Sequence, residues 1–125
     1  MLIRSAKNKG MRLQKEICQK IIDKFKLRNS DIRSIPGSVP GNDIWLSNEA
    51  HNKFPFNVEA KNQEHLNIWK AIKQVEERTN LIADYPLVVF SRNRSDTYCC
   101  LKFNDFLNLI DKESLWNVQN AIPQN

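Results

Sequence analysis

The strongest constraint on the fold is a short segment, residues 56–61, in which apolar and polar side chains alternate strictly. The six residues, in order, are Phe56, Asn57, Val58, Glu59, Ala60 and Lys61. Successive side chains of a strand point to opposite faces. The alternation therefore predicts a strand with its apolar face in the core, and it places Glu59 and Lys61 together on the other face.

A second short strand is predicted at residues 43–47, directly after a loop that holds two prolines and two glycines. Ile44 and Leu46 would face the core, which leaves Asp43 on the side away from it. The polar segment 48–54 between the two predicted strands is typical of a hairpin connection. A roughly symmetric hairpin would place Asp43 opposite Glu59.

Two carboxylates that face each other across a strand pair repel. A divalent cation between Asp43 and Glu59 would turn that repulsion into a binding site. Lys61, two residues beyond Glu59, would reach a phosphate group or the attacking water. The combination predicts metal-assisted cleavage of a phosphodiester. The alternative is that all three are solvent-facing charges of an amphipathic hairpin, with Glu59 and Lys61 as a surface pair.

The whole chain of 125 residues is long enough for one hydrophobic core. We therefore expect a single domain over residues 1–125, with a basic arm at residues 1–8 and a polar tail at residues 122–125. No stretch approaches the ~18 apolar residues of a membrane span, and the N-terminus lacks the apolar run of a signal peptide. The cysteines show no metal-ligand spacing, and we expect them to be reduced in a cytoplasmic protein. They are Cys18, Cys99 and Cys100.

Positive charge is concentrated at the start of the chain. Residues 1–28 hold nine lysines and arginines against two acids, whereas the net charge of the whole chain is +5. This asymmetry predicts a surface that binds the phosphates of a nucleic acid. The alternative is an ordinary solvated basic helix.

Hydrophobic spacing elsewhere predicts two long helices. Residues 9–27 repeat apolar side chains at helical intervals, which indicates one buried face. The members of this stripe are Leu13, Ile17, Cys18, Ile21, Ile22 and Phe25. A second helix is predicted over residues 65–83, and its core candidates are Leu66, Trp69, Ile72 or Val75, and Ile82.

Further strands are predicted at residues 31–36, 86–91 and 97–103. A short helix would run to residue 110, and residues 114–121 would form another turn or helix. The expected order is α-β-β-β-α-β-β-α, an α/β fold in which a mixed sheet is flanked by helices.

Several segments in this order resemble the PD-(D/E)xK, or restriction-endonuclease-like, nuclease superfamily. They are Lys9–Arg12 leading to Glu16, the run Arg33–Ser38, Asp43, the run Val58–Lys61, and Gln74 in the second helix. Within the superfamily the chain is most similar to the archaeal-type Holliday junction resolvases and their phage relatives. The resemblance covers roughly residues 7–103.

The resemblance implies a homodimeric endonuclease that cuts two strands of a four-way DNA junction, in DNA recombination and repair. Asp43, Glu59 and the backbone carbonyl of Ala60 would hold Mg²⁺ or Mn²⁺. Lys61 would orient or help deprotonate the water, or stabilise charge on the phosphate. Cleavage would leave 5′-phosphate and 3′-hydroxyl ends.

Three further catalytic residues follow from the resemblance alone. Glu16 matches a helix glutamate of the metal or water network, although an ion pair within the helix is an alternative. Ser38 matches a loop serine that contacts a phosphate, and Gln74 matches a polar helix residue that faces the site. Turn chemistry and simple solvation are the respective alternatives. The expected DNA-binding residues are Arg4, Lys7, Lys9, Arg12, Arg33 and Ser38.

The chain departs from the family pattern at two places. Val39-Pro40 follows the loop serine where the family often has glycine, and Asn62 replaces the small hydroxyl residue that commonly follows the lysine. The stiffer loop bears on junction recognition and leaves the metal core untouched. Two other interpretations therefore stand beside the resolvase. One is a nicking, repair or restriction-type endonuclease of the same superfamily, and the other is a non-catalytic nucleic-acid-binding domain. The compact chain favours a phage or other mobile-element origin.

Overall fold

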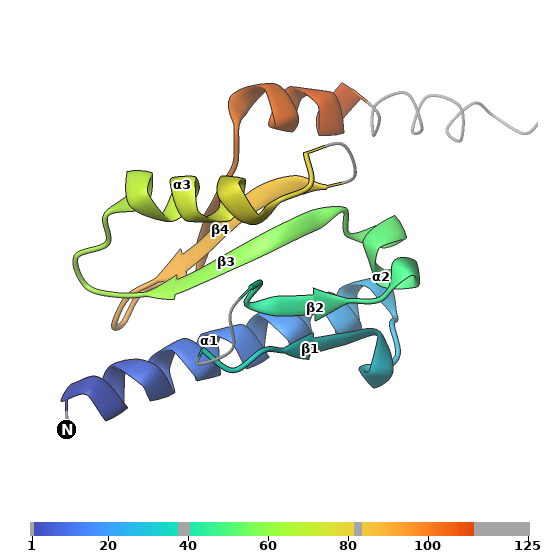
Figure 1. Ribbon diagram of the computed structural model, residues 1–125. Helices are drawn as coiled ribbons and strands as arrows, with labels where there is room; N and C mark the ends of the chain where they lie inside the picture. The colour runs from blue at the N-terminus through green and yellow to red at the C-terminus, as the bar shows by residue number, and fades with distance from the viewer. Residues whose placement is uncertain (1, 38–40, 82–83, 112–125) are drawn as a thin grey trace, which may run out of the picture.

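The computed structural model describes residues 2–37, 41–81 and 84–111, with side chains from residue 8 onward (Figure 1). Its elements are α1 (Leu2–Phe25), a 3-10 turn η1 (Asn29–Asp31), β1 (Ile32–Ser34), β2 (Ile44–Leu46), α2 (Asn48–Lys53), β3 (Phe56–Asn62), α3 (Ile68–Arg78), β4 (Tyr85–Ser91) and β5 (Tyr98–Cys100). Residues 103–111 are also helical.

The strands form two small sheets. In the larger sheet, ordered β3-β4-β5, β3 runs parallel to β4 and β5 runs antiparallel to it. The smaller sheet is an antiparallel ribbon of β1 and β2. This is the predicted restriction-endonuclease-like class, an α/β fold of mixed strands flanked by helices. The predicted order is confirmed, with one added helix, α2.

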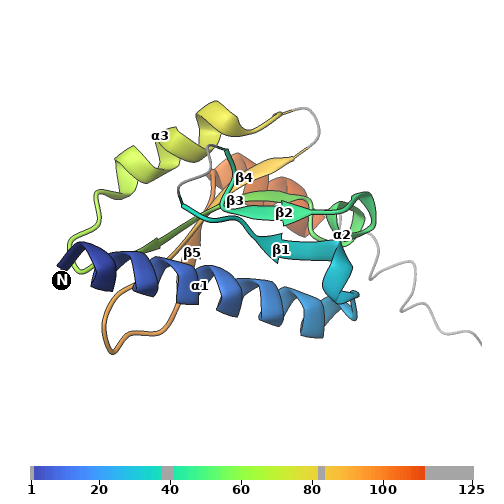
Figure 2. The same cartoon turned by 60° about the horizontal axis from the view of Figure 1, so that its bottom comes forward.

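Helices cover both faces of the larger sheet, as Figure 2 shows with α1 and α3 on opposite sides. The larger core cluster joins α1 to the β1–β2 ribbon and to one face of β3 and β4. Its members include Leu13, Ile17, Cys18, Ile21, Ile32, Ile44, Leu46, Val58, Leu87 and Val89. The smaller cluster lies under α3 and is formed by Ala71, Val75 and Val88. The predicted stripe of α1 and the predicted apolar face of β3 are thus confirmed.

The predicted hairpin between the strands of Asp43 and Glu59 is wrong. β2 pairs with β1, and the free edge of β3 lies towards β2 without a regular ladder between them. The connection holds helix α2, because the Ser47 side chain accepts a hydrogen bond from the Ala50 amide at 3.1 Å and caps a helix start. Asp43 therefore does not lie opposite Glu59 across a hairpin.

Helix α3 is shorter than the predicted segment 65–83. Asn67 caps its start by accepting from the Lys70 amide at 3.2 Å, and the helix ends at Arg78. Trp69 is not in the core, because its side chain is 78% exposed. It lies off the stripe of Ala71 and Val75 that packs on the sheet.

Helix α1 begins at Leu2, seven residues before its predicted start. Residues 2–8 of the predicted N-terminal arm are therefore the first part of this helix. Several sequence-based expectations lie outside the described residues. These are Ser38, Ile82, the segment 114–121, the tail at 122–125, and the side chains of Arg4 and Lys7. Of the helices that the structure describes, none combines the length and apolar character needed to cross a lipid bilayer.

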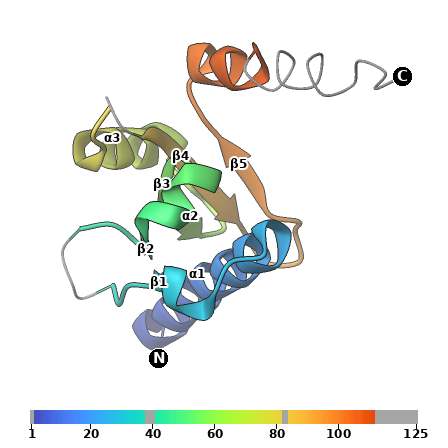
Figure 3. The ribbon, with the colours of Figure 1, turned by 90° about the vertical axis from the view of Figure 1, so that its right-hand side faces the viewer.

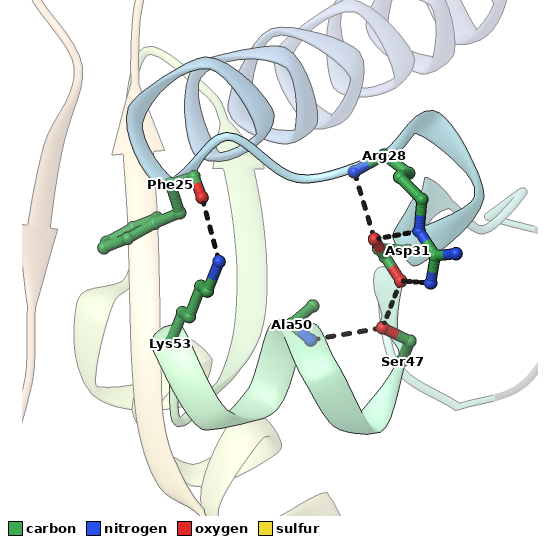
Figure 4. A network of polar contacts seen from close by, with 6 residues as sticks. All are labelled: Phe25, Arg28, Asp31, Ser47, Ala50 and Lys53. Carbon is green, nitrogen blue, oxygen red and sulfur yellow. Dashed lines mark hydrogen bonds and ion pairs between the residues drawn. The ribbon is translucent and has the colours of Figure 1, made fainter.

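A polar network fixes the β1–β2 ribbon to α2 and to the segment that follows α1 (Figure 4). Asp31 is buried, and its carboxylate accepts hydrogen bonds from the Arg28 guanidinium at 3.2 Å, the Arg28 amide at 3.0 Å and the Ser47 hydroxyl at 2.8 Å. These bonds, led by those from the Arg28 side chain, lower the pKa of Asp31 to about 2. Because Ser47 also caps α2, one carboxylate holds η1, the end of β2 and the start of α2 together.

Candidate active site

Asp43 lies directly before β2 and reaches the free edge of β3. Its Oδ2 accepts a hydrogen bond from the backbone amide of Ala60 at 2.7 Å, and its own carbonyl accepts from the Ile35 amide at 2.8 Å. β4 occupies the other edge of β3, so the Ala60 amide points away from the sheet partner. The carbonyl of Ala60 shares this edge, because both backbone groups of a strand residue point the same way.

Glu59 is buried, with 5% of its surface exposed, on the face of β3 that α3 covers. One carboxylate oxygen lies 3.3 Å from the Lys61 ammonium, and the other forms an ion pair with Arg78. A buried carboxylate needs such compensation, because desolvation of an unpaired charge is costly. The alternative of a solvent-facing Glu59–Lys61 pair does not hold for this glutamate.

Arg78, in the last turn of α3, is absent from the residues that the sequence pattern singles out. Its guanidinium pairs with Glu59 and also donates a hydrogen bond to the carbonyl of Gly41. Gly41 lies two residues before Asp43, so Arg78 connects the two carboxylate-bearing segments. The sequence signal for Arg78 is its place as a basic residue at the end of the helix that follows the Glu-x-Lys strand. At this position its charge also complements the helix dipole.

Lys61 and Gln74 share a small pocket of about 120 Å³ between β3 and α3. Gln74 is half-buried, and its side-chain oxygen is buried without a hydrogen-bond partner among the described residues. A buried acceptor without a partner is costly unless water or a ligand satisfies it. The structure therefore places Gln74 beside Lys61, with an acceptor available there.

Glu16 lies apart from these residues. Its side chain is 52% exposed and forms an ion pair with Lys20 at 3.7 Å, which is the alternative noted for it above. It lines a groove on the α1 side of the sheet together with Lys9 and Arg12. No hydrogen bond or ion pair among the described residues joins Glu16 to Asp43 or Glu59, and its catalytic role stays a prediction.

The predicted DNA-binding residues with described side chains lie in two places. Lys9 and Arg12 line the groove of Glu16 on α1. Arg33, on β1, stacks over the ring of Trp45 with 4.6 Å between the guanidinium carbon and the ring centroid. Arg33 is exposed and Trp45 is 39% exposed, so both face solvent on the ribbon.

The oxygen donors here have the chemistry that a hard divalent cation prefers. Asp43 uses only Oδ2 in its bond to Ala60, which leaves Oδ1 without a partner among the described residues. The Ala60 carbonyl and the Glu59 carboxylate complete the candidate set. Within residues 2–37, 41–81 and 84–111, no three His, Cys, Asp or Glu side chains gather as a metal cluster. A cation at Glu59 would share its oxygens with Lys61 and Arg78.

Comparison with protein families gives one result that covers nearly the whole chain. The family described as "Phage putative PDDEXK endonuclease" matches residues 5–122. Neither the search of curated proteins nor the search of solved structures returned a match. The match covers α1 from residue 5 onward, Asp43, the Glu59–Lys61 run and α3.

Proposed function

Because the chain belongs to this phage family of PD-(D/E)xK endonucleases, it is a nuclease, and we propose that it resolves four-way DNA junctions with the help of Mg²⁺. The observation that supports the site is the hydrogen bond from the Ala60 amide to Asp43, beside the buried Glu59 and its ion-pair partner Lys61. This bond brings the Asp43 carboxylate to the strand that carries the Glu-x-Lys motif.

Asp43, Glu59 and the Ala60 carbonyl would hold the metal ion. When bound, Mg²⁺ supplies Lewis-acid stabilisation of the phosphate and lowers the pKa of a coordinated water. Lys61 donates its ammonium protons to a non-bridging phosphate oxygen and stabilises the charge that develops there. The free side-chain oxygen of Gln74 accepts a hydrogen bond from the attacking water and so orients it.

Arg78 acts as a positioning residue in this scheme. It holds the Glu59 carboxylate and the Gly41 carbonyl at the same time, so the loop before Asp43 and the strand β3 keep a fixed relation. Preorganisation of this kind removes the cost of ordering the site when substrate arrives.

Junction cleavage requires two sites that face paired strands, and we propose a homodimer with two-fold symmetry. An exposed apolar stripe on the helix at residues 103–111 supports a contact with a second copy. Its members, at helical spacing, are Phe103, Phe106, Leu107 and Ile110. The enzyme would act on phage or host DNA in the host cytoplasm.

The test is cleavage of a labelled immobile four-way junction, beside linear duplex of the same arms, in Mg²⁺ or in EDTA. Paired symmetric nicks in the junction alone, with Mg²⁺ only, are the expected result. Metal-dependent cutting of both substrates would replace the resolvase by a nicking, repair or restriction-type endonuclease. Binding without cutting would mean that the fold serves as a nucleic-acid-binding module.

A further inference from the structure

A second groove lies on the opposite side of the sheet from Lys61, between the first half of α1 and the turn that joins β4 to β5. It has a volume of about 300 Å³. Figure 3 shows this turn, in orange, beside α1. We call this second groove the basic groove and define it by Lys9 and Arg12 on α1 and by Arg92 and Arg94 on the turn.

The charge of the basic groove is strongly positive. Lys9, Arg12, Arg92 and Arg94 line it against a single carboxylate, that of Glu16, which is engaged with Lys20. The side chains of Arg92 and Arg94 make no hydrogen bond or ion pair with any residue that the structure describes. Four cations gathered in a concave surface beside one carboxylate leave an excess of positive charge that attracts and retains an anionic ligand.

The turn that carries the two arginines is internally braced. The Ser91 hydroxyl is within hydrogen-bond distance of the carbonyls of Arg92, Ser95 and Asp96, at 3.3 to 3.4 Å. The Asn93 amide donates to the Glu64 carboxylate at 2.7 Å. The backbone that carries the arginines is therefore held by hydrogen bonds within the turn and to Glu64, which reduces the entropy lost when the arginines bind a ligand.

The basic groove is continuous in sequence with the candidate active site. Asn62, the last residue of β3, lines it, and its side-chain amide donates to the Lys9 carbonyl at 3.5 Å. Lys61, the preceding residue, faces α3 instead, because neighbouring strand residues point to opposite faces. A strand of nucleic acid that passes the ends of β3 and β4 would meet both.

We infer that the basic groove binds backbone phosphates of the DNA away from the bond that is cut, with Arg92 and Arg94 as ligands. Guanidinium groups suit this role, because their planar donor fork matches a phosphate. The inference rests on the proposed function for the identity of the ligand. It adds the β4–β5 turn, which carries none of the residues of the Glu-x-Lys motif, to the DNA-binding surface.

The experiment measures DNA affinity by fluorescence anisotropy in EDTA, over a series of salt concentrations. Arg92→Gln/Arg94→Gln is compared with Lys15→Gln/Lys24→Gln, which removes the same charge from exposed positions of α1 that do not line the groove. We expect the groove variant to bind about tenfold or more weakly and to lower the salt slope by about 1 for each phosphate that it no longer neutralises. The control should change the affinity by no more than about threefold.

A second arm tests whether both walls hold the same ligand. Lys9→Gln/Arg12→Gln is measured alone and together with the turn variant. If the walls share a phosphate, the combined drop in affinity is smaller than the product of the separate drops. A combined drop in affinity equal to the product of the two separate drops would overturn the inference that both walls hold the same ligand.

Equal drops in affinity for the turn variant and the control would also overturn the inference about the basic groove, because only the attraction of DNA to the overall positive charge would remain. Cleavage of the same DNA in Mg²⁺ is measured in parallel. If the parent protein binds and cuts DNA and the turn variant keeps the parent's affinity, the inference about the basic groove is refuted and the proposed function is not. A parent that neither binds nor cuts refutes the proposed function together with it.

Discussion

The carboxylate of Asp43 accepts a hydrogen bond from the backbone amide of Ala60 at 2.7 Å. This side chain takes the place that a neighbouring strand would have at the free edge of β3. The bond joins the Asp43 side chain to the main chain of the Glu-x-Lys strand. It depends on the side chain at 43 and on no particular side chain at 60. This contact is the structural basis for the first prediction.

Asp43→Asn should slow cleavage strongly while leaving the fold intact. The asparagine side-chain oxygen can still accept from the Ala60 amide, but the charge needed to hold a metal is gone. We expect the rate to fall roughly 10³-fold or more. DNA affinity in EDTA should stay near that of the parent, because it rests on lysine and arginine contacts. Single-turnover cleavage and anisotropy measure the two quantities.

Asp43→Ala serves as the contrast, since it leaves the Ala60 amide without its acceptor. The free energy of unfolding should then fall by about 1 to 3 kcal/mol, measured in urea. An Asp43→Asn protein that cuts at the parent rate would refute the assignment of this carboxylate.

Arg78→Met should destabilise the protein through Glu59. Removal of the guanidinium leaves the buried carboxylate with Lys61 as its partner and releases the Gly41 carbonyl. Removing one partner of a buried pair typically costs about 3 to 5 kcal/mol. Because the Arg78 side chain is 30% exposed, we expect about 2 kcal/mol from urea unfolding.

The matched measurement repeats Arg78→Met in a Glu59→Gln protein. There the guanidinium has no carboxylate to neutralise, so the same change should cost clearly less. Equal costs in the two backgrounds would show that Arg78 acts through packing or through Gly41.

Asp31 should make stability depend on pH at the acid end. Its pKa is about 2 in the folded protein against 3.8 for the free group, so the unfolded chain binds the proton more readily. The stabilisation is complete above about pH 4 and is lost as the pH falls through about 2. Asp31→Asn should therefore be less stable than the parent at pH 6, and the gap should narrow between pH 4 and pH 2.

Urea midpoints over this pH range measure the gap, with Asp23→Asn as the control, because Asp23 is exposed on α1 and lies outside the network of Figure 4. A constant difference between the parent and Asp31→Asn down to pH 2 would contradict the role given to the Arg28 and Ser47 hydrogen bonds.

Cys18 should resist alkylation in the folded protein. It is 6% exposed on the buried face of α1, and burial raises its pKa to about 11, so little thiolate is present near neutral pH. Cys99 is exposed and should react first. Iodoacetamide labelling at pH 8 followed by mass spectrometry, with and without urea, measures these two sites and the half-buried Cys100.

A Cys99→Ser/Cys100→Ser protein removes the exposed and the half-buried site and leaves Cys18 as its single cysteine. Rapid labelling of Cys18 in that protein without denaturant would mean that α1 leaves the sheet readily.

The sequence alone is sufficient for the elements whose periodicity reflects burial. The spacing of Leu13, Ile17 and Ile21 predicts the packed face of α1, and the alternation of residues 56–61 predicts which side of β3 enters the core. Both patterns arise because each element buries one face, and burial acts on every member of that face. The residue types of Asp43, Glu59 and Lys61 likewise indicate nuclease chemistry, in agreement with the family match.

Pairing between elements is the part that local patterns do not supply. Residues 48–54 have the composition of a turn, and Ser47, which caps them into a helix, lies at the end of the predicted strand. Strand β3 takes β4 as its partner through a crossover, since α3 between them packs on the sheet. The core position predicted for Trp69 is wrong. An apolar side chain does not show by itself which face of its helix packs on the sheet.

The sequence by itself determined the periodic faces, the fold class and the three residue types of the Glu-x-Lys site, because these follow from local side-chain chemistry. Only the tertiary structure decided that Asp43 reaches the Ala60 amide, that Arg78 neutralises Glu59, and that Arg92 and Arg94 face Lys9 and Arg12. The physical reason is that these contacts join segments far apart in the chain. Their geometry depends on how α1, α3 and the sheet pack against one another, which no local pattern encodes.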